Sequence, residues 1–445
     1  MMMNDLFAIG QSALKAYTHS LATVSQNISN AENPDYVRRS TQLADATLTG
    51  RTNPLYTTSK EHNGVRIVGI ARSADEFLEA SVRQSGSALI RTEVTAQWLG
   101  AIEADLGNGG QDVGGKLTQL FSRGEQLAAA PFDNALRQTF MADIQETADS
   151  FKRTSQNLSL TSDFIFQSAE QETAKLNTAM SDLAEVNFQL LKSRDGTASQ
   201  ASLLDQRDTA LAVITEQLNG EISFGDKGVA SVTYAGQPLV TVNNPATVSI
   251  SRNGDGSFAL AVDGSAVAAP SDGALAGLST SAQTLVVRQQ DLDAQAQTYV
   301  NDINAWQAAG ETDSGGAGGP LLSISGDAST IAVLSQDSAD LALAAPGGAA
   351  NGNILALANL RGPGGSEQAW NTLVGNHAIG LNAARGAEEA ATAFHANTSR
   401  SRDDVSRVDL DREAADLIRL QQAYSAAARV IQVARETTQS VLNIF

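Results

Sequence analysis

The sequence of 445 residues contains no cysteine, few histidines and few aromatic residues, which make up 5% of it. Without cysteine the chain can form no disulfide and no thiolate zinc site, and it has no thiol nucleophile. Its four histidines, His19, His62, His377 and His395, do not follow the spacing of metal ligands. We therefore expect no metal site and no cofactor.

Positive charge is also scarce, since the net charge is −19. Neutralising phosphates requires a surplus of Lys and Arg, so nucleic acid is not an expected partner. The charge is unevenly distributed: residues 1–60 carry +1 and residues 396–445 carry 0, which leaves −20 between them. This pattern predicts ends that pack against other protein and a centre that faces solvent.

Long apolar runs are missing as well. No stretch of eighteen apolar residues occurs, and the opening MMMNDLFAIG has neither a basic leader nor an apolar core segment. We expect no membrane insertion and no cleaved secretory signal. Export would then use a route that does not read such a signal.

What the sequence does contain is a heptad pattern at each end. Apolar residues recur every seventh position, with a second series three positions later, and Asn33-Pro34 ends the first segment. Such helices are marginal alone and need a partner, so we expect the two ends to pair as a coiled coil. Asp409 or Asp411 is the expected cap of the second helix. The predicted assembly interface consists of Phe7, Leu14, Tyr17, Leu21, Val24, Ile28, Leu410, Leu417, Leu420, Tyr424, Ile431 and Val441.

The centre reads as helices with an inserted β region. Residues 64–70 alternate as a strand, and helical periodicity covers 72–105, 116–160, 163–218 and 281–309. Valine and threonine runs between 229 and 262 are separated by turn sequences such as Asn253-Gly254. The predicted fold is mainly α with a small outer β domain. The predicted parts are 1–60 and 396–445 (coiled coil), 61–225 and 281–395 (helical middle domain) and 226–280 (β domain).

Motifs of catalysis and ligand binding are incomplete. Gly110 to Lys116 matches most of a phosphate-binding loop, but Leu117 stands where a Mg²⁺-binding Ser or Thr is required. Asn253-Gly-Asp255-Gly begins like a calcium loop and lacks its later ligands. No Gly-x-Ser-x-Gly elbow occurs. We therefore predict no catalytic residues and no enzymatic activity.

The ends carry a family resemblance. Residues 6–39, LFAIGQSALKAYTHSLATVSQNISNAENPDYVRR, resemble the N-terminal motif of flagellar rod, hook and hook-associated proteins, and residues 408–445 resemble the matching C-terminal motif. GVRIVGIARSADEFLEASVR (64–83), LLDQRDTALAVITEQL (203–218), GQPLV (236–240), VNDINAWQAAG (300–310) and NILALANL (353–360) resemble segments of the hook-associated protein 1 family. Asp35 departs from the motif, which has glycine there.

The resemblance implies a structural subunit of the junction between hook and filament. Such a subunit would be secreted unfolded by the flagellar type III apparatus and would assemble with its own copies into a ring or short tube on the extracellular flagellum. Hook protein and hook-associated protein 3 are the implied neighbours, and an export chaperone would bind the C-terminal helix. Replacing Leu417 or Ile431 by Asp should then prevent assembly and leave the body, 64–390, folded.

Other functions remain open at this stage. A hook or rod subunit would share both terminal motifs, and a flagellar cell-wall hydrolase would need an acid pair assembled from distant positions. A secreted adhesin with coiled-coil ends would form stable soluble oligomers.

Overall fold

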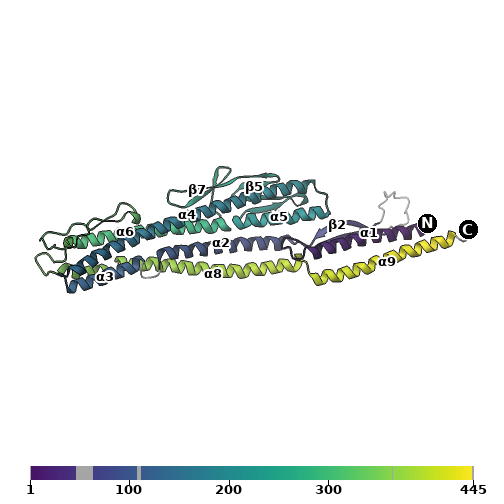
Figure 1. The fold of residues 1–445 in the computed structure, drawn as a ribbon. Coiled ribbons are helices and arrows are strands. Elements are labelled where there is room, and N and C mark those ends of the chain that lie inside the picture. The colour runs from purple at the N-terminus through teal and green to yellow at the C-terminus, as the bar shows by residue number, and fades with distance from the viewer. Residues whose placement is uncertain (1, 47–63, 108–111, 363, 443–445) are drawn as a thin grey trace. The chain divides into compact units, whose positions relative to one another are not determined.

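The computed structural model describes residues 2–46, 64–107, 112–362 and 364–442, with side chains described from residue 6 to residue 440 of these ranges (Figure 1). The chain divides into two compact units, and each is described by itself. Unit 1 consists of Met1–Gly86, Lys175–Thr247 and Ala393–Phe445, and unit 2 of Ser87–Ala174 and Val248–Thr392. Three helices contribute residues to both units: α2 (Glu76–Leu106), α4 (Asn134–Lys192) and α8 (Ser366–Ser406).

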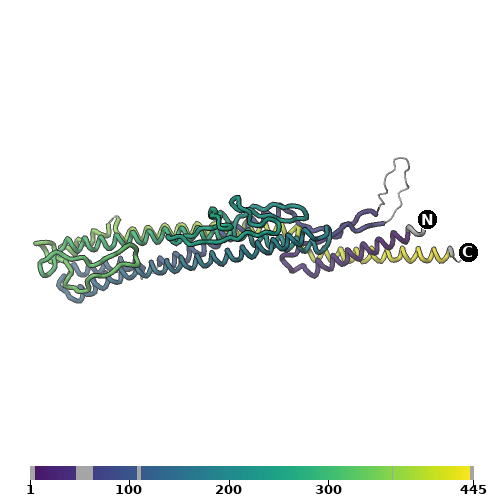
Figure 2. Tube along the Cα trace, turned by 90° about the horizontal axis from the view of Figure 1, so that it is seen from above, coloured from purple at the N-terminus to yellow at the C-terminus, as the bar shows by residue number. Residues whose placement is uncertain are grey.

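Unit 1 contains both terminal helices, α1 (Met2–Ser29) and α9 (Leu410–Leu442), which pack against each other along their length. Figure 2 shows them running side by side toward the labelled chain ends. α1 also packs against an antiparallel strand pair, β1 (Arg39–Asp45) and β2 (Val65–Arg72). α5 (Ala198–Gln217) contacts β2. The predicted pairing of the two ends is confirmed.

A four-stranded antiparallel sheet completes unit 1. Its order is β3 (Glu221–Phe224), β4 (Ala230–Tyr234), β5 (Gln237–Thr241), β6 (Asn244–Pro245). Asn187 of α4 binds this sheet through its side chain, which donates to Ala230 O (2.8 Å) and accepts from Ala230 N (2.9 Å). The Asn187 amide thus makes the two hydrogen bonds with Ala230 that a neighbouring strand would otherwise make.

Unit 2 is a helical body with small strands. Its own helices are α3 (Val113–Ala129), α6 (Ala274–Ala308) and α7 (Gly352–Ala356). Its strands form a three-stranded sheet and a short pair: β7 (Val248–Arg252), β8 (Phe258–Val262) and β9 (Ser265–Val267), then β10 (Leu322–Ser323) and β11 (Ala332–Val333). Short 3₁₀ helices occur in both units at Asp226–Gly228, Ala328–Thr330, Ser338–Asp340 and Leu357–Arg361. The predicted class, mainly α with a small β part, is confirmed.

Helix starts follow local capping chemistry. Asp75, Asp112, Asp133 and Thr197 each accept a hydrogen bond from a backbone N–H of the first turn of α2, α3, α4 and α5. At α9 the cap is Asp409, whose Oδ1 accepts from Asp411 N (2.9 Å). Each carboxylate or hydroxyl satisfies a donor that the helix itself leaves free.

One long helix leads to the C-terminal segment. α8 is continuous from Ser366 to Ser406. Alanine has the highest helix propensity, and the stretch contains no proline, so nothing interrupts it. The break between α8 and α9 falls at residues 407–409.

Candidate functional site

The terminal helices approach each other closely near the chain ends. A Cβ on Gly10 of α1 would lie 2.6 Å from Ile431 Cγ1 and 3.7 Å from Ala427 O of α9. At the other end of the pair Asn27 meets Glu413, so the helices are antiparallel. Glycine is required at residue 10 because any side chain there would push Ile431 away.

The predicted interface residues are spread over several environments. Val24 is buried, whereas Phe7, Ile28, Leu410 and Tyr424 are exposed. The side chain of Val441 lies outside those described. The remaining predicted residues are half-buried, and they are Leu14, Tyr17, Leu21, Leu417, Leu420 and Ile431.

The most buried line on α9 is made of small or polar residues. Glu413, Ala427 and Ala434 are 0%, 7% and 4% exposed, so the positions of α9 that are buried most completely carry short or polar side chains. Large apolar side chains consequently remain on the outer faces of the pair. Besides the predicted ones, these are Leu6, Ile418, Val430 and Val433. Exposed apolar side chains gathered on two helices are typical of a surface that another protein covers.

A polar network closes the pair at its inner end. Glu413 accepts hydrogen bonds from Arg38 Nε (2.7 Å) and from Asn27 Nδ2 (3.0 Å). Asn27 is itself saturated, because it also donates to Arg39 O (2.9 Å) and accepts from Tyr36 Oη (2.9 Å) and Arg39 N (3.1 Å). A buried carboxylate is tolerated only with such partners.

The network continues from β1 to α5. Arg39 Nη2 donates to Asp205 Oδ2 (2.6 Å), and Arg72 Nε of β2 lies 2.8 Å from Asp205 Oδ1. Arg72 Nη2 also donates to Asp208 Oδ2 (2.7 Å). Burial raises the pKa of Asp205, and the two arginines partly oppose this increase. Arg38, directly before β1, reaches α9, whereas Arg39, the first residue of β1, reaches α5.

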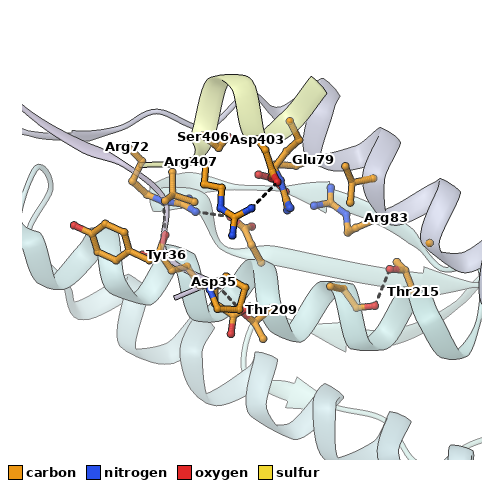
Figure 3. A pocket seen from close by; sticks show the side chains of 18 of the residues that line it. Asp35, Tyr36, Arg72, Glu79, Arg83, Thr209, Thr215, Asp403, Ser406 and Arg407 are labelled. Atoms are coloured by element: carbon orange, nitrogen blue, oxygen red, sulfur yellow. Dashed lines mark hydrogen bonds and ion pairs between the residues drawn. The ribbon is translucent and has the colours of Figure 1, made fainter. Parts of the chain in front are cut away.

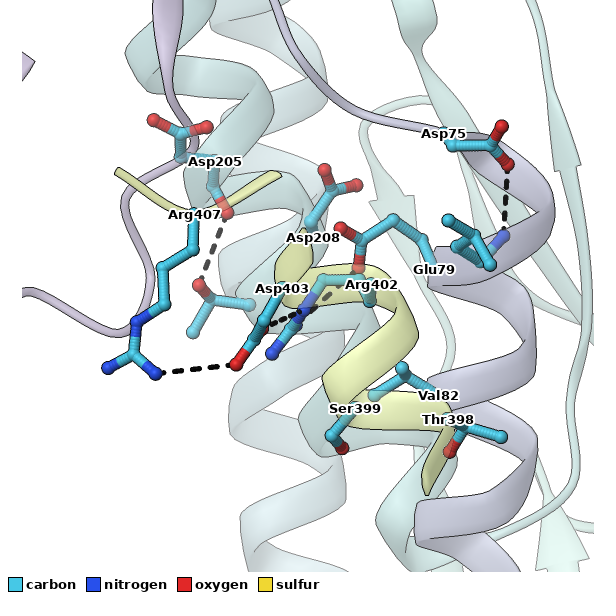
Figure 4. Close-up of polar contacts among 12 residues, drawn as sticks. Asp75, Glu79, Val82, Asp205, Asp208, Thr398, Ser399, Arg402, Asp403 and Arg407 are labelled. Carbon is cyan, nitrogen blue, oxygen red and sulfur yellow. Dashed lines mark hydrogen bonds and ion pairs between the residues drawn. The ribbon is translucent and has the colours of Figure 1, made fainter. Parts of the chain in front are cut away.

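Next to this network lies a polar hollow of about 180 Å³. Figure 3 shows residues that line it, from the segment after α1, from α2, from α5 and from the end of α8. Arginines engage two of its carboxylates: Arg402 Nε donates to Asp403 Oδ1 (2.8 Å), Arg407 Nη1 donates to Asp403 Oδ2 (3.3 Å), and Glu79 lies 3.8 Å from Arg402 (Figure 4). Burial raises the pKa of Glu79, and the charge of Arg402 opposes this increase. These ion pairs connect α2 with the end of α8.

Within the described ranges no helix is long and apolar enough to cross a membrane. In the same part of the chain no three His, Cys, Asp or Glu side chains are placed to hold a metal ion. Lys116, from the loop that resembles a phosphate-binding motif, is paired with Glu146 (3.0 Å), and Gly110 lies outside the described residues.

The network residues Asn27, Arg38 and Glu413 were absent from the predicted interface. One signal could have revealed Glu413: the heptad series Leu420, Ala427, Ala434 extends backward by seven positions to Glu413. A charged residue in an otherwise apolar series marks a buried polar contact.

Comparison with known families agrees with this architecture. The family model for the Flagellar basal body rod FlgEFG protein C-terminal region matches residues 404–444, which include α9. The model for the Flagellar hook-associated protein FlgK helical domain matches residues 99–322. Both describe flagellar proteins, so the class is that of flagellar structural components. Because the second model covers half of the chain, the chain belongs to the flagellar hook-associated protein FlgK family.

Individual relatives are also flagellar hook-associated proteins by name. The chain is 27% identical over 341 residues to the Flagellar hook-associated protein 1 of Salmonella typhimurium, covering 72% of this chain and 60% of that protein. It is 23% identical over 488 residues to the protein of that name from Bacillus subtilis, covering 97% and 96%. The solved structure of the flagellar hook junction protein FlgK from Burkholderia pseudomallei aligns with a TM-score of 0.47 at 23% identity, over 56% of this chain and 47% of that one. The chain thus spans about 60% of the length of the Salmonella relative.

Proposed function

We propose that this protein is a structural, non-enzymatic subunit of the junction between flagellar hook and filament. It is exported by the type III apparatus and assembles with copies of itself through the outer faces of α1 and α9. The observation that carries the proposal is the combination of a paired set of terminal helices with large apolar side chains left exposed on them, such as Phe7, Ile418 and Val433. Membership of the FlgK family supports it.

The partners follow from the same proposal. Copies of the chain cover the exposed apolar faces in a ring or short tube, with hook protein on one side and hook-associated protein 3 on the other. An export chaperone covers α9 before secretion. Burying a large apolar side chain contributes roughly 1.5–3 kcal/mol, so several such contacts offset the cost of ordering the helices.

The first test is deletion of the gene, followed by electron microscopy of the cells and measurement of flagellin in the medium. Hooks without filaments, together with flagellin lost to the medium, are expected. Normal filaments would refute the junction function, and the absence of hooks would instead indicate a hook or rod subunit.

Complementation of the deletion strain with point variants then tests the exposed apolar surface of α9. Leu410→Asp and Tyr424→Asp place a charge on exposed predicted interface residues, at 53% and 40% exposure, and should abolish filament growth without unfolding the chain. Ile379→Asp is the matched control, since Ile379 is a 70% exposed apolar residue on α8 in unit 2. Wild-type filament numbers with both α9 variants would count against this surface.

A further inference from the structure

The packing of α1 on α9 leaves open how the two helices find their correct register. Small residues lie in this contact, namely Gly10, Ala427 and Ala434. Ala427 and Ala434 are seven residues apart on one line of α9 and present the same small surface. Moving α9 by one heptad would put Ala434 in the place of Ala427 and Thr438 in the place of Ile431, so the small-residue contact at Ala427 is kept.

The polar end of the pair does not tolerate such a shift. A displacement that brings Ala434 to the place of Ala427 also brings Leu420 to the place of Glu413. Arg38, which is 14% exposed, would then lose its 2.7 Å contact with the carboxylate, and Asn27 would lose an acceptor. Buried polar groups left without partners are costly, whereas the shift keeps an alanine at the place of Ala427.

We propose that Glu413, held by Arg38 and Asn27, is the positioning residue that selects the register of α1 on α9. A single buried polar contact in a helical seam is known to specify register at some cost in stability. Glu413 serves this purpose because it is fully buried and because both partners come from outside α9. Arg38 and the neighbouring Arg39 link this register to α5 through Asp205.

The inference rests on the proposed function for its consequence. A fixed register of the helix pair determines where the apolar side chains on the outer face of α9 lie along those of α1, and therefore the surface that the next subunit meets. A chain in a mixture of registers would present a mixture of surfaces.

Disulfide cross-linking can measure the register because the natural chain has no cysteine. With Asn27 opposite Glu413 and Gly10 opposite Ile431, Ala13 lies level with Ala427. The pair Ala13→Cys with Ala427→Cys reports this register, and Ala13→Cys with Ala434→Cys reports a shift of seven residues. The two positions are about 10 Å apart along the helix, beyond the Cα separation that a disulfide spans.

The variant to test is the double replacement Arg38→Met with Glu413→Leu in the full chain. Replacing both partners by apolar residues avoids leaving one buried charge alone, so the helices remain paired. Asp411→Leu is the matched control, since it removes an exposed carboxylate from the same turn of α9. Gel mobility under non-reducing conditions separates the intramolecular cross-link from dimers.

In the otherwise unchanged chain and in the control, we expect the Ala427 pair to form at least about tenfold faster than the Ala434 pair, a difference of about 1.4 kcal/mol. In the double variant the two rates should become similar. An unchanged ratio in the double variant, or equal rates in the unchanged chain, would overturn the proposal. Because the assay uses purified protein, it is independent of the deletion experiment, and either idea can fail alone.

Discussion

The core of unit 2 and the base of the terminal helices in unit 1 are built from different kinds of side chain. Unit 2 is held by aromatic packing: Phe151 stacks on Tyr299 with ring centroids 5.5 Å apart and meets Trp370 edge-on at 6.2 Å. In unit 1 the base of the terminal helices is held by Asn27, Arg39 and Glu413, all buried. Apolar contact is non-directional and stabilises many similar arrangements, whereas hydrogen bonds and ion pairs require one geometry.

This difference matches the roles proposed for the two units. A body that only has to stay folded gains most from large apolar side chains, and all three tryptophans of the sequence, Trp98, Trp306 and Trp370, belong to unit 2. Helices that must meet neighbours in one orientation gain from contacts that exist in one register only. Stability and specificity are therefore supplied by different residues of the same chain.

The largest expected effect is in the apolar core. Phe151→Ala removes a ring that is 0% exposed and contacts two other aromatic rings, and it should lower the free energy of unfolding by about 3–5 kcal/mol. Urea unfolding followed by tryptophan fluorescence and by circular dichroism measures it. Phe132→Ala, at a 75% exposed phenylalanine, should change the value by less than about 0.5 kcal/mol. Equal effects of the two variants would contradict the description of this core.

A smaller effect is expected where unit 1 relies on backbone contact. β2 meets the turn before α5 at two glycines: Ile70 N donates to Gly196 O (2.9 Å), and a Cβ on Gly196 would lie 3.1 Å from Gly69 Cα. Gly196 has φ +70°, so Gly196→Ala adds a left-handed alanine, costing about 1–2 kcal/mol, and also a steric contact.

Gly236 provides the control for this prediction. Its φ is +78°, yet nothing lies within 4 Å of a Cβ placed there, so Gly236→Ala isolates the backbone term. Thermal unfolding of both variants should show Gly196→Ala as the less stable. If Gly236→Ala lowers the stability as much as Gly196→Ala does, the close contact between β2 and the turn before α5 contributes nothing to stability.

Much of this organisation could be predicted from the sequence because it depends on local chemistry. Heptad spacing predicted two terminal helices that need each other, and Asp409 was one of two expected caps. Turn sequences at Asn253-Gly254 predicted the hairpin of β7 and β8. These features depend on residues close together in the chain.

The rest depends on which face of a helix meets which neighbour. α1 packs on α9 and on β1 and β2 together, so no single apolar stripe describes its contacts. Asn27 and Arg38 become network residues only because the fold brings Glu413 to them. Glu413 is 386 residues from Asn27 in the sequence. Local sequence spacing does not predict a contact over that separation, although the heptad position of Glu413 indicated that its side chain is buried.

The smallest expected effect is a pH dependence of opposite sign in the two units. Hydrogen bonds from Arg361 and Thr118 hold the pKa of Glu367, in unit 2, below its ordinary value of 4.5. Its contribution to stability is therefore present above pH 4.5 and is lost as pH falls through the lower, folded value. Burial raises the pKa of Glu79, in unit 1, above 4.5. Folding then takes up protons, so this site becomes less favourable as pH rises from 4.5 through the raised value.

Unfolding measured between pH 7 and pH 3 for Glu367→Gln, Glu79→Gln and the unchanged chain separates these effects. As pH falls, the unchanged chain should lose its advantage over Glu367→Gln and should gain relative to Glu79→Gln. Glu170→Gln, at an exposed residue of α4, serves as the control for adding an amide. If stability depends on pH in the same way for both variants, the carboxylates of the two units experience the same environment. The contrast between the aromatic core of unit 2 and the polar network of unit 1 would then not extend to their charged groups.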